Sequence, residues 1–111
     1  MKKLDPLHSL NVMSLKMGDL FSTQENDHGR PPVVGFFEYL DGVKSVTRIG
    51  SSTAYFKPVE TEIIGIYFRK NVKDLKSGYW ARFHEVWIEG KLCVIHEQFI
   101  NPMNKRGKKD E

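Results

Sequence analysis

The chain has 111 residues and a formal net charge of +3 at pH 7, and 40% of its residues are hydrophobic. This length predicts a single domain with a modest core. The single cysteine, Cys93, excludes an intramolecular disulfide framework and makes a reducing compartment the expected setting. No apolar run reaches the roughly 18 residues that a membrane-spanning helix needs, so no membrane partner is expected.

The positive charge is concentrated at the C-terminal end. Residues 101–111 carry four cations and two anions, a net charge of +2, which leaves +1 for residues 1–100. A body so close to neutrality is unlike a strongly basic nucleic-acid-binding domain. We therefore expect one β-rich domain over residues 1–100 and a disordered charged tail over residues 101–111.

The first segment, residues 1–21, fits two kinds of element. Its apolar residues recur at three- and four-residue spacing, which favours a short helix, although residues 10–17 also alternate as a strand would. We favour the helix. Residues 22–32 are polar, contain Gly29 and end in two prolines, which predicts a flexible loop.

An Asp-Gly pair separates two apolar segments, residues 33–40 and 43–49. Asp41-Gly42 favours a two-residue hairpin turn, because both positions tolerate positive φ, so the two segments are predicted to pair with each other. Apolar side chains alternate onto both faces of residues 33–40, which predicts a strand covered on both sides. Residues 53–56 are interpreted as a short strand or turn.

Three consecutive strands are predicted at residues 61–70, 79–88 and 91–100, where β-branched and aromatic residues alternate with a period of two. A polar turn at residues 71–78 joins the first two, and Glu89-Gly90 joins the last two. With the preceding hairpin, these make about five strands. The expected fold is mainly β, a small antiparallel β-barrel or sandwich with a short N-terminal helix.

The turn at Glu89-Gly90 allows two registers. A two-residue turn pairs Ile88 with Lys91, whereas a three-residue loop with a bulge pairs Trp87 with Lys91. We favour the bulged register because it needs a positive φ only at Gly90, and the other needs it at Glu89 as well. The bulged register turns Trp87 toward the core.

Four residues of these strands suggest metal or acid–base chemistry: His84, Glu85, His96 and Glu97. In the favoured register the two histidines share the face opposite the core, and the glutamates point to the other face. Two ligands fall short of a zinc site, and no HExxH or CxxC spacing is present. We predict no metal, no cofactor and no enzymatic activity. Cys93 falls on the core face, which predicts an inert buried thiol.

A second functional interpretation is a platform that stacks single-stranded nucleic acid. It would use interleaved aromatic and basic residues, namely Tyr55, Phe56, Tyr67, Phe68, Trp80, Trp87, Arg69, Lys70 and Arg82. The core of so small a protein needs half or more of these aromatics, so this interpretation remains an alternative.

A third interpretation comes from residues 18–37, GDLFSTQENDHGRPPVVGFF. They resemble the opening of the MazF/PemK endoribonuclease toxins, which begin with a Gly-Asp strand and have an Arg-Pro before an apolar strand. The serine- or threonine-bearing segment that follows in that family is missing here, and this alternative is the weaker one.

A resemblance over residues 43–106 covers more of the chain. A strand with Val43 and Val46 leads to a small-residue break at Gly50-Ser51-Ser52, and the next strand ends in Tyr67-Phe68-Arg69. An Asp-bearing turn, a hairpin with Gly90 at its tip and a final Asn-Pro follow. This order is similar to that of the tailed-phage head–tail joining proteins, also called head-closure or adaptor proteins. The family usually has a tryptophan where Val43 or Val46 stands, and residues 1–50 match it poorly.

The resemblance implies a structural virion protein that forms a ring below the portal, closes the capsid and docks the tail. Its implied partners are further copies of itself, portal and tail proteins, and DNA in the channel lumen. The implied location is the virion, which is assembled in the host cytoplasm. The expected contact residues are on loops, strand ends and the tail: Asp27, His28, Arg30, Asp41, Gly42, Arg69, Lys70, Lys105 and Arg106.

Overall fold

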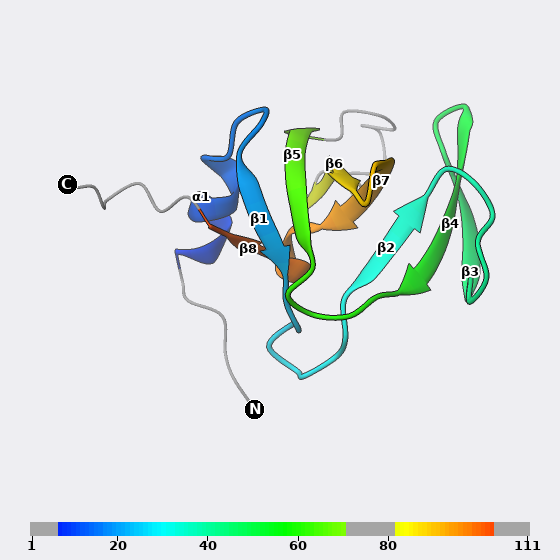
Figure 1. The fold of residues 1–111 in the computed structure, drawn as a ribbon, viewed down its shortest axis with the longest axis horizontal. Coiled ribbons are helices and arrows are strands. Elements are labelled where there is room, and N and C mark those ends of the chain that lie inside the picture. The colour runs from blue at the N-terminus through cyan, green and yellow to red at the C-terminus, as the bar shows by residue number, and fades with distance from the viewer. Residues whose placement is uncertain (1–6, 71–81, 104–111) are drawn as a thin grey trace.

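The computed structural model of the protein describes residues 7–70 and 82–103. These residues form a short helix, α1 (His8–Met13), a 3-10 turn, η2 (Glu97–Phe99), and eight strands (Figure 1). The strands are β1 (Leu20–Thr23), β2 (Val33–Phe36), β3 (Ser45–Ile49), β4 (Ser52–Pro58), β5 (Ile64–Lys70), β6 (Phe83–Ile88), β7 (Lys91–His96) and β8 (Ile100–Pro102).

All strand pairs described are antiparallel and belong to one sheet with the order β3-β4-β2-β7-β6-β5-β1-β8. The mainly-β class and the short N-terminal helix are confirmed. The strands are more numerous than the predicted five, and the sheet is not closed into a barrel. No helix among the described residues is long and apolar enough to cross a membrane.

The three-strand meander is confirmed as β5–β6–β7, but the predicted register of its last hairpin is wrong. Ile88 pairs with Lys91, so the turn has two residues. Glu89 has φ 53° and Gly90 has φ 78°, which are the two left-handed positions of such a turn. The segment predicted as the polar turn, residues 71–78, lies outside the described residues.

Burial explains why this register forms. It places Val86, Ile88 and Cys93 on the face of the larger core, where each is at most 1% exposed. Burying an apolar side chain stabilises by about 1.5–3 kcal/mol, whereas holding a non-glycine residue in the left-handed region costs about 1–2 kcal/mol. The gain therefore exceeds the cost at Glu89. The same register turns Trp87 to the opposite face, where the prediction had placed it in the core.

The predicted hairpin around Asp41-Gly42 is also wrong. Strand β2 ends at Phe36 and pairs with β4 and β7, whereas β3 pairs with β4 through a turn at Gly50-Ser51. The Asp-Gly pair still makes a turn, with Gly42 at φ 91°, but this turn lies inside the β2–β3 connection. The expectation that the β2 segment is covered on both sides is confirmed, because Val34 and the residues up to Phe36 are buried.

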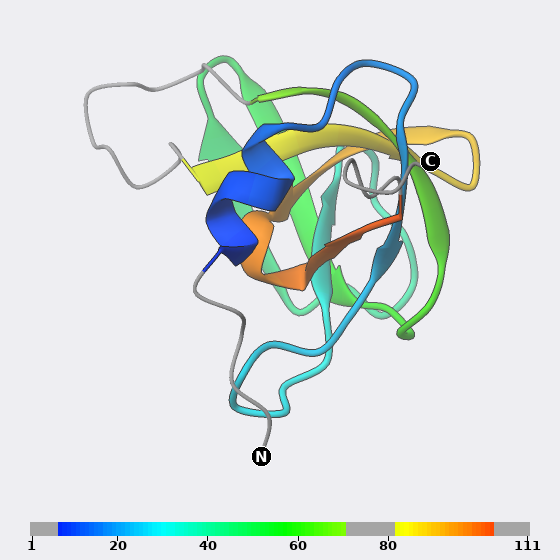
Figure 2. The ribbon, with the colours of Figure 1, turned by 90° about the vertical axis from the view of Figure 1, so that its left-hand side faces the viewer.

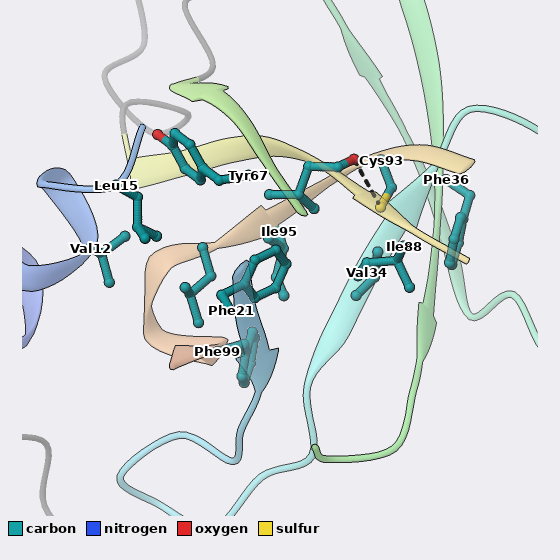
Figure 3. Packing of buried hydrophobic residues seen from close by; sticks show 12 residues of the cluster. Val12, Leu15, Phe21, Val34, Phe36, Tyr67, Ile88, Cys93, Ile95 and Phe99 are labelled. Carbon is teal, nitrogen blue, oxygen red and sulfur yellow. Dashed lines mark hydrogen bonds between the residues drawn. The ribbon is translucent and has the colours of Figure 1, made fainter. Parts of the chain in front are cut away.

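Two apolar clusters lie on opposite faces of β6 and β7. The larger one is the main core, in which Phe21, Tyr67 and Phe99 gather with side chains from β2, β6 and β7 (Figure 3). The second core forms where the β3–β4 hairpin packs Ile49, Ala54 and Phe56 on Phe83 and Val94.

Each core contains one cross-strand pair of a glycine with a phenylalanine. Gly65 faces Phe21, and Gly35 faces Phe56. A Cβ atom at Gly65 would lie 2.4 Å from Cζ of Phe21, and one at Gly35 would lie 2.7 Å from Cζ of Phe56. Glycine is therefore needed for close approach, because the ring on the neighbouring strand covers its backbone.

The helix α1 lies on the core side of the sheet and contacts β8 and η2 (Figure 2). Val12 of the helix and Leu15, which follows the helix, are buried in the main core. Its N-terminal anchor is a contact of 2.8 Å between His8 Nε2 and the Glu97 carbonyl oxygen. Leu20 and Phe21, which the helical pattern included, form β1 together with Ser22 and Thr23 of the predicted loop. Asn101-Pro102 is part of β8, which pairs with β1.

Candidate interaction surface

A row of apolar side chains crosses four neighbouring strands on the sheet face opposite the main core. Leu20 pairs with Ile66, Ile66 with Trp87, and Trp87 with Leu92. Directly paired residues of antiparallel strands project to the same face, so the four side chains are adjacent. Leu20 is 40% exposed, Ile66 45% and Trp87 40%, and Leu92 is half-buried. We call Leu20, Ile66, Trp87 and Leu92 the apolar row.

The apolar row widens along β5. Ile64 is exposed, and the Phe68 ring lies 6.4 Å from the Trp87 ring, centroid to centroid. The Arg69 guanidinium stands 4.7 Å from the Phe68 centroid, a cation–π contact. Its Nε also donates to Oε1 of Glu85, at 3.1 Å. Contiguous exposed apolar patches of this kind are uncommon on monomers and mark interaction sites.

A second exposed apolar group lies at the N-terminal end of the described chain. Leu10 and Met13 are three residues apart on α1, and Met17 follows just beyond the helix; all three are more than half exposed. We call these three residues the helix patch. The helix patch and the apolar row are distinct, because α1 packs through Val12 on the core side of the sheet and the row lies on the other side.

The predicted contact residues do not form one surface. Asp27, His28 and Arg30 belong to the turn after β1, which Asn26 closes by accepting the backbone N–H groups of residues 28 and 30, each at 2.9 Å. This turn lies at the bottom of Figure 1, whereas β5 ends at the top with Arg69 and Lys70.

Asp41 and Gly42 are exposed in the β2–β3 connection, and Lys105 and Arg106 lie outside the described residues. Among the predicted contact residues that the structure describes, Arg69 borders the apolar row. The contacts of all nine residues remain predictions.

The prediction that His84 and His96 share a face is wrong. His84 pairs with Ile95 of the main core, whereas His96 pairs with Phe83 of the second core. The physical reason is the two-residue turn, since a shift by one position in one strand exchanges its faces. Among the described residues no group of three or more His, Cys, Asp or Glu side chains is placed to hold a metal ion.

His84 is a buried structural residue. It is 1% exposed, and its Nδ1 lies 2.8 Å from the Tyr67 hydroxyl. Burial lowers the pKa of His84 to about 4 and raises the pKa of Tyr67 to about 12, so both side chains are neutral at pH 7. One hydrogen bond joins the Tyr67 hydroxyl and Nδ1 of His84, and the tautomer of the neutral imidazole decides which of the two donates.

Glu97 joins α1 to the sheet. Its carboxylate accepts hydrogen bonds from the Ser9 hydroxyl and the Arg82 guanidinium. Burial alone would raise the pKa of Glu97, but these two hydrogen bonds and the Arg82 charge bring the pKa below its usual value. Cys93 is fully buried as predicted, and burial raises the pKa of its thiol to about 12.

The stacking platform keeps only part of its proposed residues. Tyr67 and Phe56 are buried in the two cores, and Arg82 is bound to Glu97. Phe68, Trp87 and Arg69 remain together at the surface. Trp80 lies outside the described residues.

No family model matches the chain, and neither a curated protein nor a solved structure shows significant similarity to it. Sequence reasoning missed the apolar row because Leu20 was assigned to the helix and Trp87 to the core. The signal was present on β5, where Ile64, Ile66 and Phe68 alternate with the buried Gly65 and Tyr67. When both faces of a strand are rich in apolar residues, the second face needs a cover as well.

Proposed function

We propose that this chain is a structural protein that assembles with copies of itself, and that its assembly is the ring between phage head and tail that the sequence resemblance implies. The observation that carries the proposal is the apolar row, which stays exposed beside the second core on the sheet face opposite the main core. The resemblance over residues 43–106 supplies the biological setting.

The contact that we propose is heterologous: the helix patch of one copy packs on the apolar row of the next. A helix on a sheet face is a standard way of burying both apolar surfaces. Because the two surfaces are different and lie on opposite sides of the sheet, each copy can bind one neighbour through each. Head-to-tail contacts of this kind generate a ring when the rotation between copies closes.

The strength of the contact can be bounded. Seven partly exposed side chains would be buried, at roughly 1 kcal/mol each for about half of a side chain, giving roughly 7 kcal/mol before other costs. Association costs about 4–15 kcal/mol in lost freedom of motion. A single contact is therefore weak. A closed ring gives every copy two contacts, so assembly should depend steeply on protein concentration.

The test is sedimentation velocity over a concentration series up to about 0.5 mM, where weak contacts are populated. The wild type should form species larger than a dimer, and Trp87→Glu should remain a monomer. Val46→Glu is the matched control, because Val46 is exposed on β3 outside both surfaces, and it should assemble as the wild type does. A wild type that stays monomeric throughout the series contradicts the proposal.

The virion setting has a separate test. Assembled protein is incubated with DNA-filled capsids that carry a portal, and binding is followed by electron microscopy. Density below the portal supports the head–tail role. Self-assembly without capsid binding would retain the ring contact and contradict the head–tail role.

A further inference from the structure

A cleft of about 280 Å³ opens beside the second core, between the β3–β4 hairpin on one side and β7 with η2 on the other. Phe56 and Phe83 form apolar walls, with ring centroids 6.2 Å apart at an angle of 82°. His96 stands edge-to-face against Phe83, with centroids 5.0 Å apart. The cleft therefore has aromatic surfaces on which a flat ring can pack.

Two side chains with hydroxyl groups line the cleft, at positions where apolar side chains would fill it. Ser45 and Thr47 pair with Phe56 and Ala54, so they project to the face that carries Ile49 in the second core. Ile49 is fully buried, whereas Ser45 and Thr47 line the cleft. The inward face of β3 thus changes from apolar to hydroxyl-bearing along its length, and the hydroxyl-bearing part borders the open space.

His96 supplies a hydrogen-bond donor. Its Nδ1 accepts the backbone N–H of Gln98 at 3.1 Å. Burial lowers the pKa of His96 below its usual value, so the ring is neutral at pH 7. A neutral imidazole that accepts at Nδ1 carries its hydrogen on Nε2. His96 lines the cleft, and Nε2–H is the donor that its side chain can offer to a ligand.

Gln98 supplies a second donor, and a chain of hydrogen bonds sets its orientation. Asn26 accepts two backbone N–H groups at Oδ1, so its Nδ2 is the donor that reaches Oε1 of Gln98, at 3.3 Å. Because Oε1 of Gln98 is the acceptor, the other end of this amide is the NH₂ group. Among the described residues no acceptor is bonded to this Nε2, so it is available to a ligand in the cleft that Gln98 lines.

We propose that this cleft binds a neutral, planar ring compound that bears a carbonyl oxygen. The ring packs on Phe56 and Phe83, and the carbonyl oxygen accepts from His96 and Gln98, with the hydroxyls of Ser45 and Thr47 beside it. Carboxylates are disfavoured because the described lining contains no lysine or arginine, and a carboxylate loses water without gaining a counter-ion. This binding site does not depend on the proposed ring-shaped assembly of protein copies.

The test is an NMR titration of the whole ¹⁵N-labelled protein with benzamide as the probe. A fragment of this size should bind with a dissociation constant on the order of 10 mM, with saturable shifts at Thr47, His96 and Gln98. Benzoate adds a charge, and cyclohexanecarboxamide replaces the flat ring. Each should bind at least about fivefold more weakly than benzamide if the neutral carbonyl and the stacking both matter.

Thr47→Val removes a hydroxyl with little change of shape and should weaken benzamide binding about fivefold. Thr53→Val on β4 is the matched control, because Thr53 is outside the cleft, and it should bind as the wild type does. Three results would overturn the proposal: no saturable shifts up to about 50 mM benzamide, tighter binding of benzoate, or equal binding by Thr47→Val and the wild type.

Discussion

Lowering the pH from 7 toward 4 should destabilise this fold through His84. The folded state holds this imidazole neutral, because burial lowers its pKa from 6.5 to about 4. In the unfolded chain the imidazole keeps its ordinary pKa, so the unfolded state binds a proton between these two values and the folded state does not. Stability therefore falls as the pH drops through this window. At 1.36 kcal/mol per pKa unit, the loss amounts to about 3 kcal/mol.

Two other titratable side chains affect stability in or near this pH range. Burial lowers the pKa of His96 as well, so His96 acts in the same direction. The pKa of Glu97 lies below its usual value of 4.5, so its contribution is present above pH 4.5 and is lost only at lower pH. The loss between pH 6.5 and 4.5 therefore belongs to the histidines.

The assay is urea unfolding followed by circular dichroism at several pH values between about 7 and 4, which gives the unfolding free energy at each. His84→Gln replaces the imidazole by a neutral amide that can still form a hydrogen bond with the Tyr67 hydroxyl. It should be less stable than the wild type at pH 7, and its stability should decline by about 3 kcal/mol less over this window. A wild type that keeps its stability down to pH 4.5, or an equal decline in His84→Gln, would refute the reasoning.

Two further predictions concern the main core. Gly65→Ala should lower the unfolding free energy by about 1–3 kcal/mol, because the added Cβ would lie 2.4 Å from the Phe21 ring. In thermal denaturation, combining it with Phe21→Leu should recover part of the lost stability. A Gly65→Ala variant as stable as the wild type would contradict the close approach. The Cys93 thiol should react with Ellman's reagent only as fast as the protein unfolds, because it is fully buried and burial raises its pKa to about 12. Labelling in native buffer that is as rapid as labelling in urea would contradict this burial.

The meander could be predicted because its evidence is local. Residues of β5, β6 and β7 alternate strongly, and each strand pairs with the next one along the chain. The turn that joins β6 and β7 could not be predicted from φ preferences, because the cost at Glu89 is local and the burial of Ile88 and Val86 is a property of the assembled core.

The pairing of β2 failed for a related reason. Asp41-Gly42 correctly indicates a turn, but a turn does not decide which strands meet. Strand β2 lies between β4 and β7, and its contact with β7 joins segments far apart in the sequence, such as Val34 with Ile95. Such non-local pairing depends on shape, here on the space over Gly35 that the Phe56 ring fills.

Both of these errors explain why the apolar row was not predicted. Assigning Trp87 to the core followed from the one-residue difference in register, and extending the helical pattern to residue 21 hid Leu20. Leu10 and Met13 of the helix patch, in contrast, lie on α1, a helix that the same spacing indicated. A sequence can indicate that a face is apolar, but the tertiary packing decides whether anything covers it.

The most direct test of the proposed assembly mixes two variants that should each be unable to form rings. Leu10→Glu disrupts the helix patch and leaves the apolar row intact, and Trp87→Glu does the reverse; both positions are exposed, so both variants should fold. In a head-to-tail contact, the intact helix patch of Trp87→Glu binds the intact row of Leu10→Glu. Sedimentation of the equimolar mixture should therefore show a dimer with one copy of each variant, while each variant alone remains a monomer. A mixture that contains only monomers up to about 0.5 mM, where a weak single contact should be populated and the wild type assembles, would contradict the account.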